Sequence, residues 1–456
     1  MPLFLFYNVF SHNGSFLIIL FNLFSFKIFK MKLSSYNFIL YDSKYSYWFN
    51  ALTHRFFRLS IALGKKLELM LNNYIEIEKK ANVFWNKLKE CGFLIDDGID
   101  ELSIIRQNND FSIRNKDYFL IILPTLNCNF SCWYCIQSHI PSKMSEQTLE
   151  SIKRHIDYMI ECKRITSLHL DWFGGEPFMY FKNIIHPISI YAKEKCLQFN
   201  IPFTNSSTTN GFFLSKTVSE QLSELKFSHF QITLDGEKTF HDKVKFQKGC
   251  LSAFDNVLNN INTCLDINQE LKIYLRINYT HKTLTKNIVN EVNQIITKDN
   301  RNRIVITPKK VWQEKVDKNF MSKLVEILDL FAVSGYKVSL FAPSSSFIPC
   351  YANKEYYSAI NFNGNVVKCT ACNDIYKKET HGKLDNNGII VWDKNFEKRY
   401  QCKSYENEKC LKCKKLPICM GVCPRDFIIG NTNCKYDSED INLEQSIINY
   451  IKYEYE

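Results

Sequence analysis

Residues 128–135 read Cys-Asn-Phe-Ser-Cys-Trp-Tyr-Cys, and the rest of the chain is best understood from this stretch. It follows an apolar run at 119–123 that is predicted to be a strand ending at Pro124. Thiolates are soft ligands that suit iron–sulfur clusters or zinc. Because a 4Fe–4S cluster normally takes four cysteines, three on one loop would leave one iron open to a substrate or cofactor. A structural zinc loop and a ferredoxin-type cluster stay open as alternatives for so short a motif.

Strand-like and helix-like runs alternate from residue 118 to about residue 340. This alternation predicts parallel βαβ units, and six units fit a partial, open (β/α)6 barrel better than a closed barrel of eight. The fold class is therefore expected to be α/β, with the site at the carboxyl ends of the strands. The predicted strands are 118–123, 166–173, 202–209, 229–234, 272–279 and 303–307, and the predicted helices are 146–162, 184–197, 216–225, 253–265 and 285–297.

Short polar motifs follow several of the predicted strands. Residues 172–177 read Trp-Phe-Gly-Gly-Glu-Pro, in which the glycines let the backbone approach a ligand closely and Glu176 offers a carboxylate to an ammonium group. The third strand ends Thr-Thr-Asn-Gly at 208–211, and the fourth ends Thr-Leu-Asp-Gly at 233–236. The fifth reads Leu-Arg-Ile-Asn-Tyr at 275–279. Each motif by itself is an ordinary strand end, so only the order of the motifs along the chain indicates a function.

The cysteine stretch and the ordered strand-end motifs resemble the radical SAM superfamily, and in particular its peptide-modifying enzymes. The resemblance implies a 4Fe–4S cluster whose open iron binds exchangeable S-adenosylmethionine, and a 5′-deoxyadenosyl radical that abstracts a substrate hydrogen. The protein would supply binding, orientation and exclusion of side reactions. The implied cluster ligands are Cys128, Cys132 and Cys135. The implied cofactor contacts are Tyr134, Gly174, Gly175, Glu176, Thr233 and Arg276.

A second group of cysteines lies nearer the C-terminus, with spacing C-x2-C-x5-C-x3-C over residues 410–423. Together with cysteines at 350, 369 and 434 it resembles the SPASM domain, which carries auxiliary 4Fe–4S clusters. A pair of zinc knuckles is the alternative. The resemblance implies that the distal cluster takes Cys410, Cys413, Cys419 and Cys434, and that the proximal cluster takes Cys350, Cys369 and Cys423.

The chain departs from the sulfatase-maturating members of this family at two positions. Six residues before Cys350, where those enzymes carry a fourth proximal ligand, this chain has Ser344. Where they carry an Asp after the next proximal cysteine, this chain has Thr370. The proximal cluster is therefore expected to have an open iron or to take Cys372 or Cys402. Both departures disfavour formylglycine formation. The resemblance implies, as the favoured product, a ribosomal peptide cross-linked by a thioether or carbon–carbon bond.

Other functions and partners were weighed beside this one. An anaerobic sulfatase-maturating enzyme, a multi-cluster electron-transfer protein and a zinc-dependent binding module stay open. The Gly-Gly-Glu-Pro motif at 174–177 speaks against a pure electron carrier, because a carrier needs no ammonium-binding loop. The expected partners are a ribosomally made precursor peptide or a protein substrate, and a flavodoxin- or ferredoxin-type electron donor. No catalytic residue is assigned from the sequence.

The composition is that of a globular protein of several domains: 456 residues, 45% hydrophobic and 23% charged. Of the seventeen cysteines, nine lie in or near two closely spaced groups, which favours metal binding over disulfides and therefore a reducing cytoplasm. The remaining thiols are expected to be structural: Cys91, Cys162, Cys196, Cys250 and Cys264. The net charge of +11 suits an acidic partner. Because the lysines are scattered rather than clustered, a nucleic-acid partner is not expected.

Four regions are predicted along the chain: 1–30, an α+β module at 31–115, the radical SAM core at 116–342 and the SPASM domain at 343–456. The apolar run at 16–24 is shorter than the ~18 residues of a membrane span and lacks the flanks of a signal peptide. A misplaced start codon, with Met31 as the true start, is favoured over a hydrophobic leader or signal anchor, and no membrane partner is expected.

The α+β module carries no catalytic signature. A strand is predicted at 36–41, helices at 55–66 and 74–89, and a short helix after an acidic turn at 96–102. The module is expected to be a packing cap on the barrel, and the alternative is a docking surface for a peptide substrate.

Overall fold

The computed structural model describes residues 30–314, 320–340, 343–371, 381–434, 436 and 442–455. The chain divides into two compact units. Unit 1 comprises Met1–Ser112, Pro343–Asn353 and Arg399–Ile451, and unit 2 comprises Ile113–Ala342, Lys354–Lys398 and Lys452–Glu456. Residues 343–456 contribute to both units, and the four regions expected from the sequence stay a prediction.

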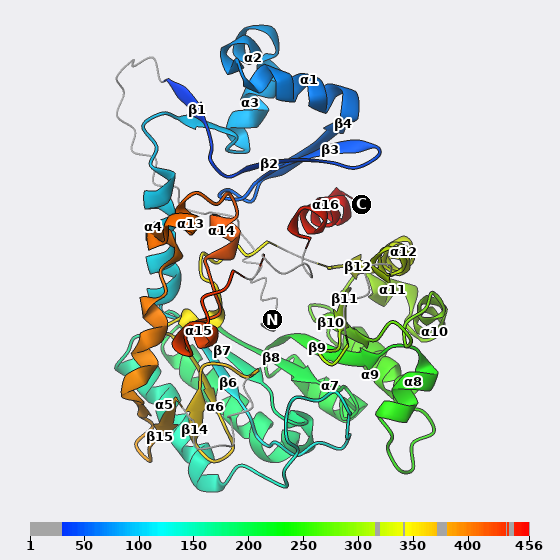
Figure 1. Cartoon of the computed structure of the whole chain (residues 1–456). Helices are drawn as coiled ribbons and strands as arrows, with labels where there is room; N and C mark the ends of the chain where they lie inside the picture. The colour runs from blue at the N-terminus through cyan, green and yellow to red at the C-terminus, as the bar shows by residue number, and fades with distance from the viewer. Residues whose placement is uncertain are drawn as a thin grey trace. The chain divides into compact units, whose positions relative to one another are not determined.

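Unit 2 is an α/β structure built on a large, mostly parallel sheet, as the sequence predicts (Figure 1). Six of its strands pair in parallel in chain order. They are β6 (Asp117–Ile122), β7 (Ser167–Trp172), β8 (Phe203–Thr209), β9 (Phe227–Asp235), β10 (Lys272–Tyr279) and β11 (Ile304–Lys310). The helices between them are α5 (Glu146–Glu161), α6 (His186–Gln198), α7 (Lys216–Leu222), α8 (Lys238–Val244), α9 (Ala253–Ile267), α10 (Asn287–Ile295) and α11 (Lys298–Arg301). Pro177–Tyr180 (η1) and Phe181–Ile185 (η2) precede α6, and α12 (Phe320–Val333) leads to β12 (Lys337–Val338), which pairs with β11.

The two faces of this sheet differ in chemistry. Tyr118, Leu120 and Ile122 of β6 join one buried core with α5 residues such as Ile152. Because side chains alternate along a strand, the intervening positions point to the opposite face, which is polar over β7 and β8. There the Ser206 hydroxyl donates to Asp171 at 2.6 Å. Parallel strands buried on both faces are normally apolar throughout, so the polar face is the one available for chemistry.

Residues beyond the sixth strand extend the same sheet. β13 (Tyr357–Ile360) pairs in parallel with β6, and β14 (Asn365–Val367), β15 (Gly382–Leu384) and β16 (Ile390–Trp392) follow in antiparallel order. Buried His155 of α5 contacts both the Tyr118 hydroxyl at 2.6 Å and the Gly388 carbonyl at 2.7 Å. This imidazole therefore ties the added strands to the parallel core.

Unit 1 contains a three-stranded antiparallel sheet followed by three helices. The strands are β2 (Asn37–Tyr41), β3 (Tyr45–Asn50) and β4 (Phe56–Ser60), and the helices are α1 (Ile61–Leu71), α2 (Tyr74–Lys80) and α3 (Asn82–Glu90). Trp48, Phe57, Leu67 and Trp85 share their core. A second pair, β1 (Met31–Leu33) and β5 (Leu94–Asp96), precedes the long helix α4 (Glu101–Arg114).

The predicted helix at 55–66 is wrong in its first half, where β4 lies. Phe57 stacks on Trp48 of β3 with ring centroids 5.3 Å apart, and Ser60 then caps α1 by accepting from the Leu63 N–H. The partner strand β3 was not predicted. The helix expected after the acidic turn is present as α4, and with 14 residues it is longer than expected. Tertiary pairing of aromatic side chains therefore overrides the local helical spacing.

The C-terminal segments are short, as expected of a region rich in turns. They are η3 (Tyr351–Asn353), η5 (Lys394–Gln401), η6 (Ser404–Glu406), α13 (Glu408–Leu411), α14 (Leu416–Cys419), α15 (Pro424–Ile428) and the longer α16 (Leu443–Tyr455). Within the described part of the chain, no helix is long and apolar enough to cross a membrane. The apolar run at 16–24 lies outside the described residues.

Candidate functional site

The loop that follows β6 carries three thiols. Cys128 and Cys132 are partly buried and Cys135 is exposed. A turn closes the loop, with the Cys135 N–H donating to the Cys132 carbonyl at 3.0 Å, and the Phe130 N–H donates to the Cys128 sulfur at 3.4 Å. From the end of β8, the Asn210 side-chain amide approaches the Cys128 sulfur to 3.8 Å.

The loop thiols are protonated in the absence of a metal. Burial, with help from Glu176, raises the pKa of Cys128 to about 12, and burial raises that of Cys132 to about 11. Metal binding would therefore be coupled to proton release. Among the described residues, no three or more His, Cys, Asp or Glu side chains are arranged to hold a metal ion. Zinc needs all its sulfurs about 2.3 Å from one point, whereas a 4Fe–4S cluster takes each thiolate on a different iron. An all-thiolate donor set is accepted by iron–sulfur clusters and by zinc alike, so these residues fit the cluster that the sequence predicts.

The two glycines after β7 let this turn pack directly on the cysteine loop. A Cβ on Gly174, whose φ is +124°, would lie 2.2 Å from the Thr125 carbonyl oxygen, and one on Gly175 would lie 2.1 Å from that of Asn127. The Gly175 N–H donates to the Thr125 carbonyl at 3.1 Å. The close approach expected from the sequence is therefore made to the loop backbone, and the cofactor contact of these glycines stays a prediction.

Glu176 is fully buried and is held by three donors of the protein. Its carboxylate accepts from the Phe178 N–H at 2.9 Å, the Thr209 hydroxyl at 2.7 Å and the Asn210 N–H at 2.8 Å. Burial raises its pKa, and these hydrogen bonds oppose the rise. Glu176 thereby braces the ends of β7 and β8 against each other. Its expected contact with an ammonium group stays a prediction.

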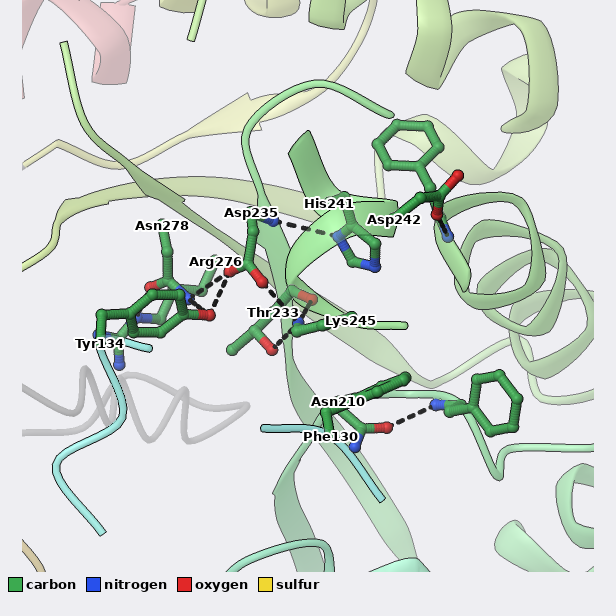
Figure 2. A network of polar contacts seen from close by, with 12 residues as sticks. Phe130, Tyr134, Asn210, Thr233, Asp235, His241, Asp242, Lys245, Arg276 and Asn278 are labelled. Atoms are coloured by element: carbon green, nitrogen blue, oxygen red, sulfur yellow. Dashed lines mark hydrogen bonds and ion pairs between the residues drawn. The ribbon is translucent and has the colours of Figure 1, made fainter. Parts of the chain in front are cut away.

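A second set of buried polar contacts joins the cysteine loop to β9 and β10, as Figure 2 shows. We call it the Asp235 clasp, formed by Tyr134, Asp235, Lys245 and Asn278. The Tyr134 hydroxyl donates to Asp235 Oδ1, and Asn278 Nδ2 donates to the same oxygen at 3.1 Å. Lys245 Nζ lies 3.7 Å from Asp235 Oδ2. Tyr134 directly precedes Cys135, so the clasp fixes the end of the cysteine loop.

The charges of the clasp are defined by their surroundings. Burial alone would raise the pKa of Asp235, but the charge of Lys245 and the hydrogen bonds from Tyr134 and Asn278 outweigh it and hold that pKa below its usual value. Burial lowers the pKa of His241 to about 3, so its imidazole is neutral and Nδ1 accepts from the Asp235 N–H at 3.2 Å. Burial also raises the pKa of Tyr134, which keeps the phenol a donor.

Thr233 and Arg276, both expected from the sequence, lie beside the clasp (Figure 2). The Thr233 hydroxyl accepts from Lys245 Nζ at 2.6 Å, and Arg276 Nε donates to Asn278 Oδ1 at 2.9 Å. Burial, and then the charge of Arg276, lower the pKa of Lys309 on β11 to about 8. The carboxyl end of the sheet is therefore rich in cationic side chains.

Sequence reasoning missed several members of this site. Asp235 and Asn278 stand inside the quoted motifs at 233–236 and 275–279, and Asn210 stands inside 208–211, so their positions were visible without their roles. Lys245 carried no signal, because it lies in the stretch after α8 and outside every motif. Only the fold shows that it is 2% exposed and paired with Asp235.

Unit 1 contains the four thiols expected to hold the distal cluster. After burial, Cys419, Cys413 and Cys434 are the strongest influences that raise the pKa of Cys410. Their role as ligands stays a prediction. Of the thiols expected at the proximal cluster, Cys350 and Cys423 belong to unit 1 and Cys369 belongs to unit 2. Cys372 lies outside the described residues. Of the thiols expected to be structural, Cys91, Cys196 and Cys264 are buried, Cys250 is partly buried and Cys162 is exposed.

Comparison with protein families and curated proteins gives partial matches. Residues 122–283 match the sequence model of the Radical SAM superfamily. The chain is 27% identical over 164 residues to the Fe-coproporphyrin III synthase of Methanosarcina barkeri. The aligned stretch covers 36% of this chain and 37% of that protein. It is 28% identical over 201 residues to the GTP 3′,8-cyclase of Vibrio atlanticus, covering 39% and 55%. It is 26% identical over 160 residues to the serine-type anaerobic sulfatase-maturating enzyme of Bacteroides thetaiotaomicron, covering 32% and 36%. The chain thus matches between about a third and about half of the length of these relatives.

Solved structures with the same fold cover most of the chain. Streptococcus suis SuiB bound to precursor peptide SuiA superposes with a TM-score of 0.52 at 15% identity, covering 91% of this chain and 100% of that one. Native anSMEcpe with bound AdoMet and Cp18Cys peptide superposes with a TM-score of 0.51 at 20% identity, covering 74% and 96%. At these identities the likeness shows a shared fold.

Proposed function

Because this chain carries a radical SAM domain over residues 122–283, we propose that it is an enzyme that cleaves S-adenosylmethionine reductively to modify a peptide or protein. The observation that carries the proposal is the three-thiol loop, which is packed on the Gly174–Gly175 turn and fastened by the Asp235 clasp at the carboxyl end of a parallel sheet. When bound, a 4Fe–4S cluster with S-adenosylmethionine would supply a 5′-deoxyadenosyl radical.

The residues of the chain would hold and orient these groups. Cys128, Cys132 and Cys135 would ligate three irons. Arg276, a partly buried guanidinium on β10, suits a carboxylate, for which Arg is a strong hydrogen-bonding partner. Tyr134 would keep the loop, and with it the open iron, facing the polar side of the sheet. Auxiliary clusters on the C-terminal cysteines would take up an electron after hydrogen abstraction or bind a substrate thiolate.

A ribosomally made precursor peptide is the substrate that we favour. A solved structure with the same fold, Streptococcus suis SuiB, is bound to precursor peptide SuiA, which supports a peptide substrate here. The docking role of the α+β module at 31–115 stays a prediction.

Formylglycine formation is the second candidate, because the chain is similar to a sulfatase-maturating enzyme over 160 residues. Thr370 stands where those enzymes are expected to carry an Asp, and its side chain is 2% exposed. A buried hydroxyl is a poor general base, so cross-linking of a ribosomal peptide is favoured. A sulfatase-derived peptide carrying the target Cys or Ser should therefore remain unmodified by mass spectrometry.

The metal content tests the proposal as a whole. Protein reconstituted anaerobically with iron and sulfide should be brown and hold about twelve irons per chain if three cubane clusters are present. A colourless protein that binds only zinc would contradict every part of the proposal.

A further inference from the structure

Residues 246–251, between α8 and α9, form a turn that exposes two large apolar side chains; we call it the projecting turn. The Cys250 N–H donates to the Gln247 carbonyl at 3.1 Å, which closes the turn and brings Phe246 and Leu251 to its two ends. Phe246 is 70% exposed and Leu251 is fully exposed. A Cβ on Gly249 would meet no described atom within 4 Å, so the tip of the turn stands clear of the rest of unit 2.

Both ends of the projecting turn are fixed to the protein. Before it, Lys245 is 2% exposed, and its Nζ donates to the Thr233 hydroxyl at 2.6 Å. After it, the Ser252 hydroxyl caps α9 by accepting from the Asp255 N–H at 3.1 Å. The two apolar side chains are therefore held in solvent by a fixed base. Exposed apolar side chains that gather in one place, with polar residues around them, mark interaction sites.

The surroundings of the projecting turn are cationic. Residues 241–252 contain three lysines and one carboxylate, Asp242, which is partly buried and accepts from a backbone N–H at 2.9 Å. Lys243 and Lys248 are exposed, whereas Lys245 is the buried lysine of the Asp235 clasp. Such charges speed the association of a partner of opposite sign. An apolar pair with cations beside it therefore suits a protein with an acidic surface.

The projecting turn is joined directly to the cysteine loop. Gln247 Oε1 accepts from Asn129 Nδ2 at 3.2 Å, and Asn129 is the residue after Cys128. A protein that docks on the turn would thus lie beside the loop expected to hold the cluster. Reductive cleavage of S-adenosylmethionine needs one electron from outside the chain for each molecule cleaved. Weak redox complexes are among the smallest protein interfaces, so a short turn offers enough surface for an electron donor.

We propose that the projecting turn is the docking site of an acidic, flavin-bearing electron carrier of the flavodoxin type. The exposed Phe246 ring suits contact with the apolar edge of a flavin, and Lys243 and Lys248 suit carboxylates of the carrier. One electron leaves the anionic flavin hydroquinone, which becomes the neutral semiquinone. That electron is consumed at the cysteine loop, where the C–S bond of S-adenosylmethionine breaks to give methionine and a 5′-deoxyadenosyl radical. The inference rests on the proposed function, because only reductive cleavage gives such a surface a use.

The test compares two double variants that change the net charge equally. Lys243→Glu/Lys248→Glu reverses the charges beside the projecting turn. Lys163→Glu/Lys298→Glu reverses two exposed lysines that lie shortly before β7 and β11, at the amino ends of these strands. Each reconstituted full chain receives S-adenosylmethionine with either dithionite or a bacterial flavodoxin kept reduced by NADPH and its reductase. The release of 5′-deoxyadenosine is then quantified.

The two reductants should separate the variants. Lys243→Glu/Lys248→Glu should need about ten times more flavodoxin or above for its half-maximal rate, because the attracting charges are reversed. Added salt should slow wild type with flavodoxin and not this variant, since salt screens attraction between exposed charges. Lys163→Glu/Lys298→Glu should match wild type. With dithionite, which needs no docking surface, both variants should release the nucleoside at the wild-type rate. Phe246→Ser should weaken the use of flavodoxin and keep the salt dependence.

Three outcomes would overturn the proposal. The first is equal use of flavodoxin by the two double variants, and the second is a wild type that responds to dithionite and not to flavodoxin. In the third, a ferredoxin alone drives cleavage, which would rule out a flavin-bearing carrier. If Lys243→Glu/Lys248→Glu also fails with dithionite, Lys243→Gln/Lys248→Gln decides by the same comparison. No release by wild type with dithionite would instead refute the proposed function.

Discussion

The two thiol-bearing regions of this protein are built in different ways. In unit 2 the cysteine loop rests on buried polar groups that are satisfied by the protein itself: Glu176 is 0% exposed with three donors, and Asp235 is 4% exposed with two donors and a lysine. In unit 1 the cysteines at 402–434 lie on helices of four or five residues and on turns. Helices this short are not stable by themselves. We infer that the first site is preorganised before metal binds, whereas the second depends on metal for its order.

Hydrogen exchange should show the largest contrast between these regions. On anaerobic reconstitution, amides at 408–428 should gain at least about tenfold protection, because metal binding supplies folding free energy to small domains. Amides at 233–245 should change little. Mass spectrometry of apo and reconstituted protein measures both segments in one experiment. Equal gains in both segments would show that the first site also depends on metal for its order.

Asp235→Asn should cause the largest loss of stability in the first site. The substitution leaves Lys245 buried without its counter-charge, which costs about 3–5 kcal/mol. Tyr134→Phe, which keeps the ion pair, should cost less, about 1.5–3 kcal/mol. Urea unfolding at pH 7 measures both values. Similar losses in the two variants would mean that the ion pair adds nothing beyond the hydrogen bond.

The loss of folding stability in Asp235→Asn should depend on pH in one direction. The folded pKa of Asp235 lies below its ordinary value, which is about 3.9 in an unfolded chain. Its stabilising contribution is therefore fully present above pH ~4 and is lost as the pH falls through the folded pKa. The gap between wild type and Asp235→Asn should be constant from about pH 5 to 8 and shrink below about pH 4. A gap that shrinks already at neutral pH would contradict the charge assignment.

Gly174→Ala should have a smaller effect, and it has a matched control. Both Gly174 and Gly249 have positive φ, so alanine strains the backbone at each, by about 1–3 kcal/mol. Only at Gly174 does the new Cβ meet a carbonyl oxygen, that of Thr125, while at Gly249 it meets no atom within 4 Å. Overpacking should add about 1–3 kcal/mol at Gly174. Urea midpoints that fall equally would show that the loop simply moves aside.

The sequence predicted the parallel core well because its periods are long and regular. All six predicted strands and the five predicted helices of unit 2 are present, with ends that shift by a few residues. In unit 1 the run at 45–60 is short and aromatic, so its sequence pattern does not distinguish helix from strand. The strand conformation depends on a tertiary contact, the stacking of Phe57 on Trp48. The cysteine loop could be predicted from the sequence, because its three cysteines form a recognisable motif. The ion pair of Lys245 with Asp235 could not be predicted, because Lys245 lies outside every motif and meets Asp235 only in the folded chain.

Cys413→Ala should have the smallest effect on the first site and a large one on the product. If the auxiliary clusters act on the substrate or remove an electron, the folded variant should still cleave S-adenosylmethionine at nearly the wild-type rate and form little modified peptide. Iron content is the control, because loss of a cluster can unfold a small metal-dependent domain. Wild-type yields of modified peptide from a variant that lacks this cluster would make the second region structural.

The release of 5′-deoxyadenosine tests the central claim most directly. Reconstituted full-length protein is incubated anaerobically with dithionite and S-adenosylmethionine, beside Cys132→Ala and the exposed-thiol control Cys162→Ala, and the nucleoside is quantified by chromatography. The account predicts release by wild type and by Cys162→Ala, and none above background by Cys132→Ala. Wild-type release by Cys132→Ala, or no release by a wild-type protein with its full iron content, would contradict it.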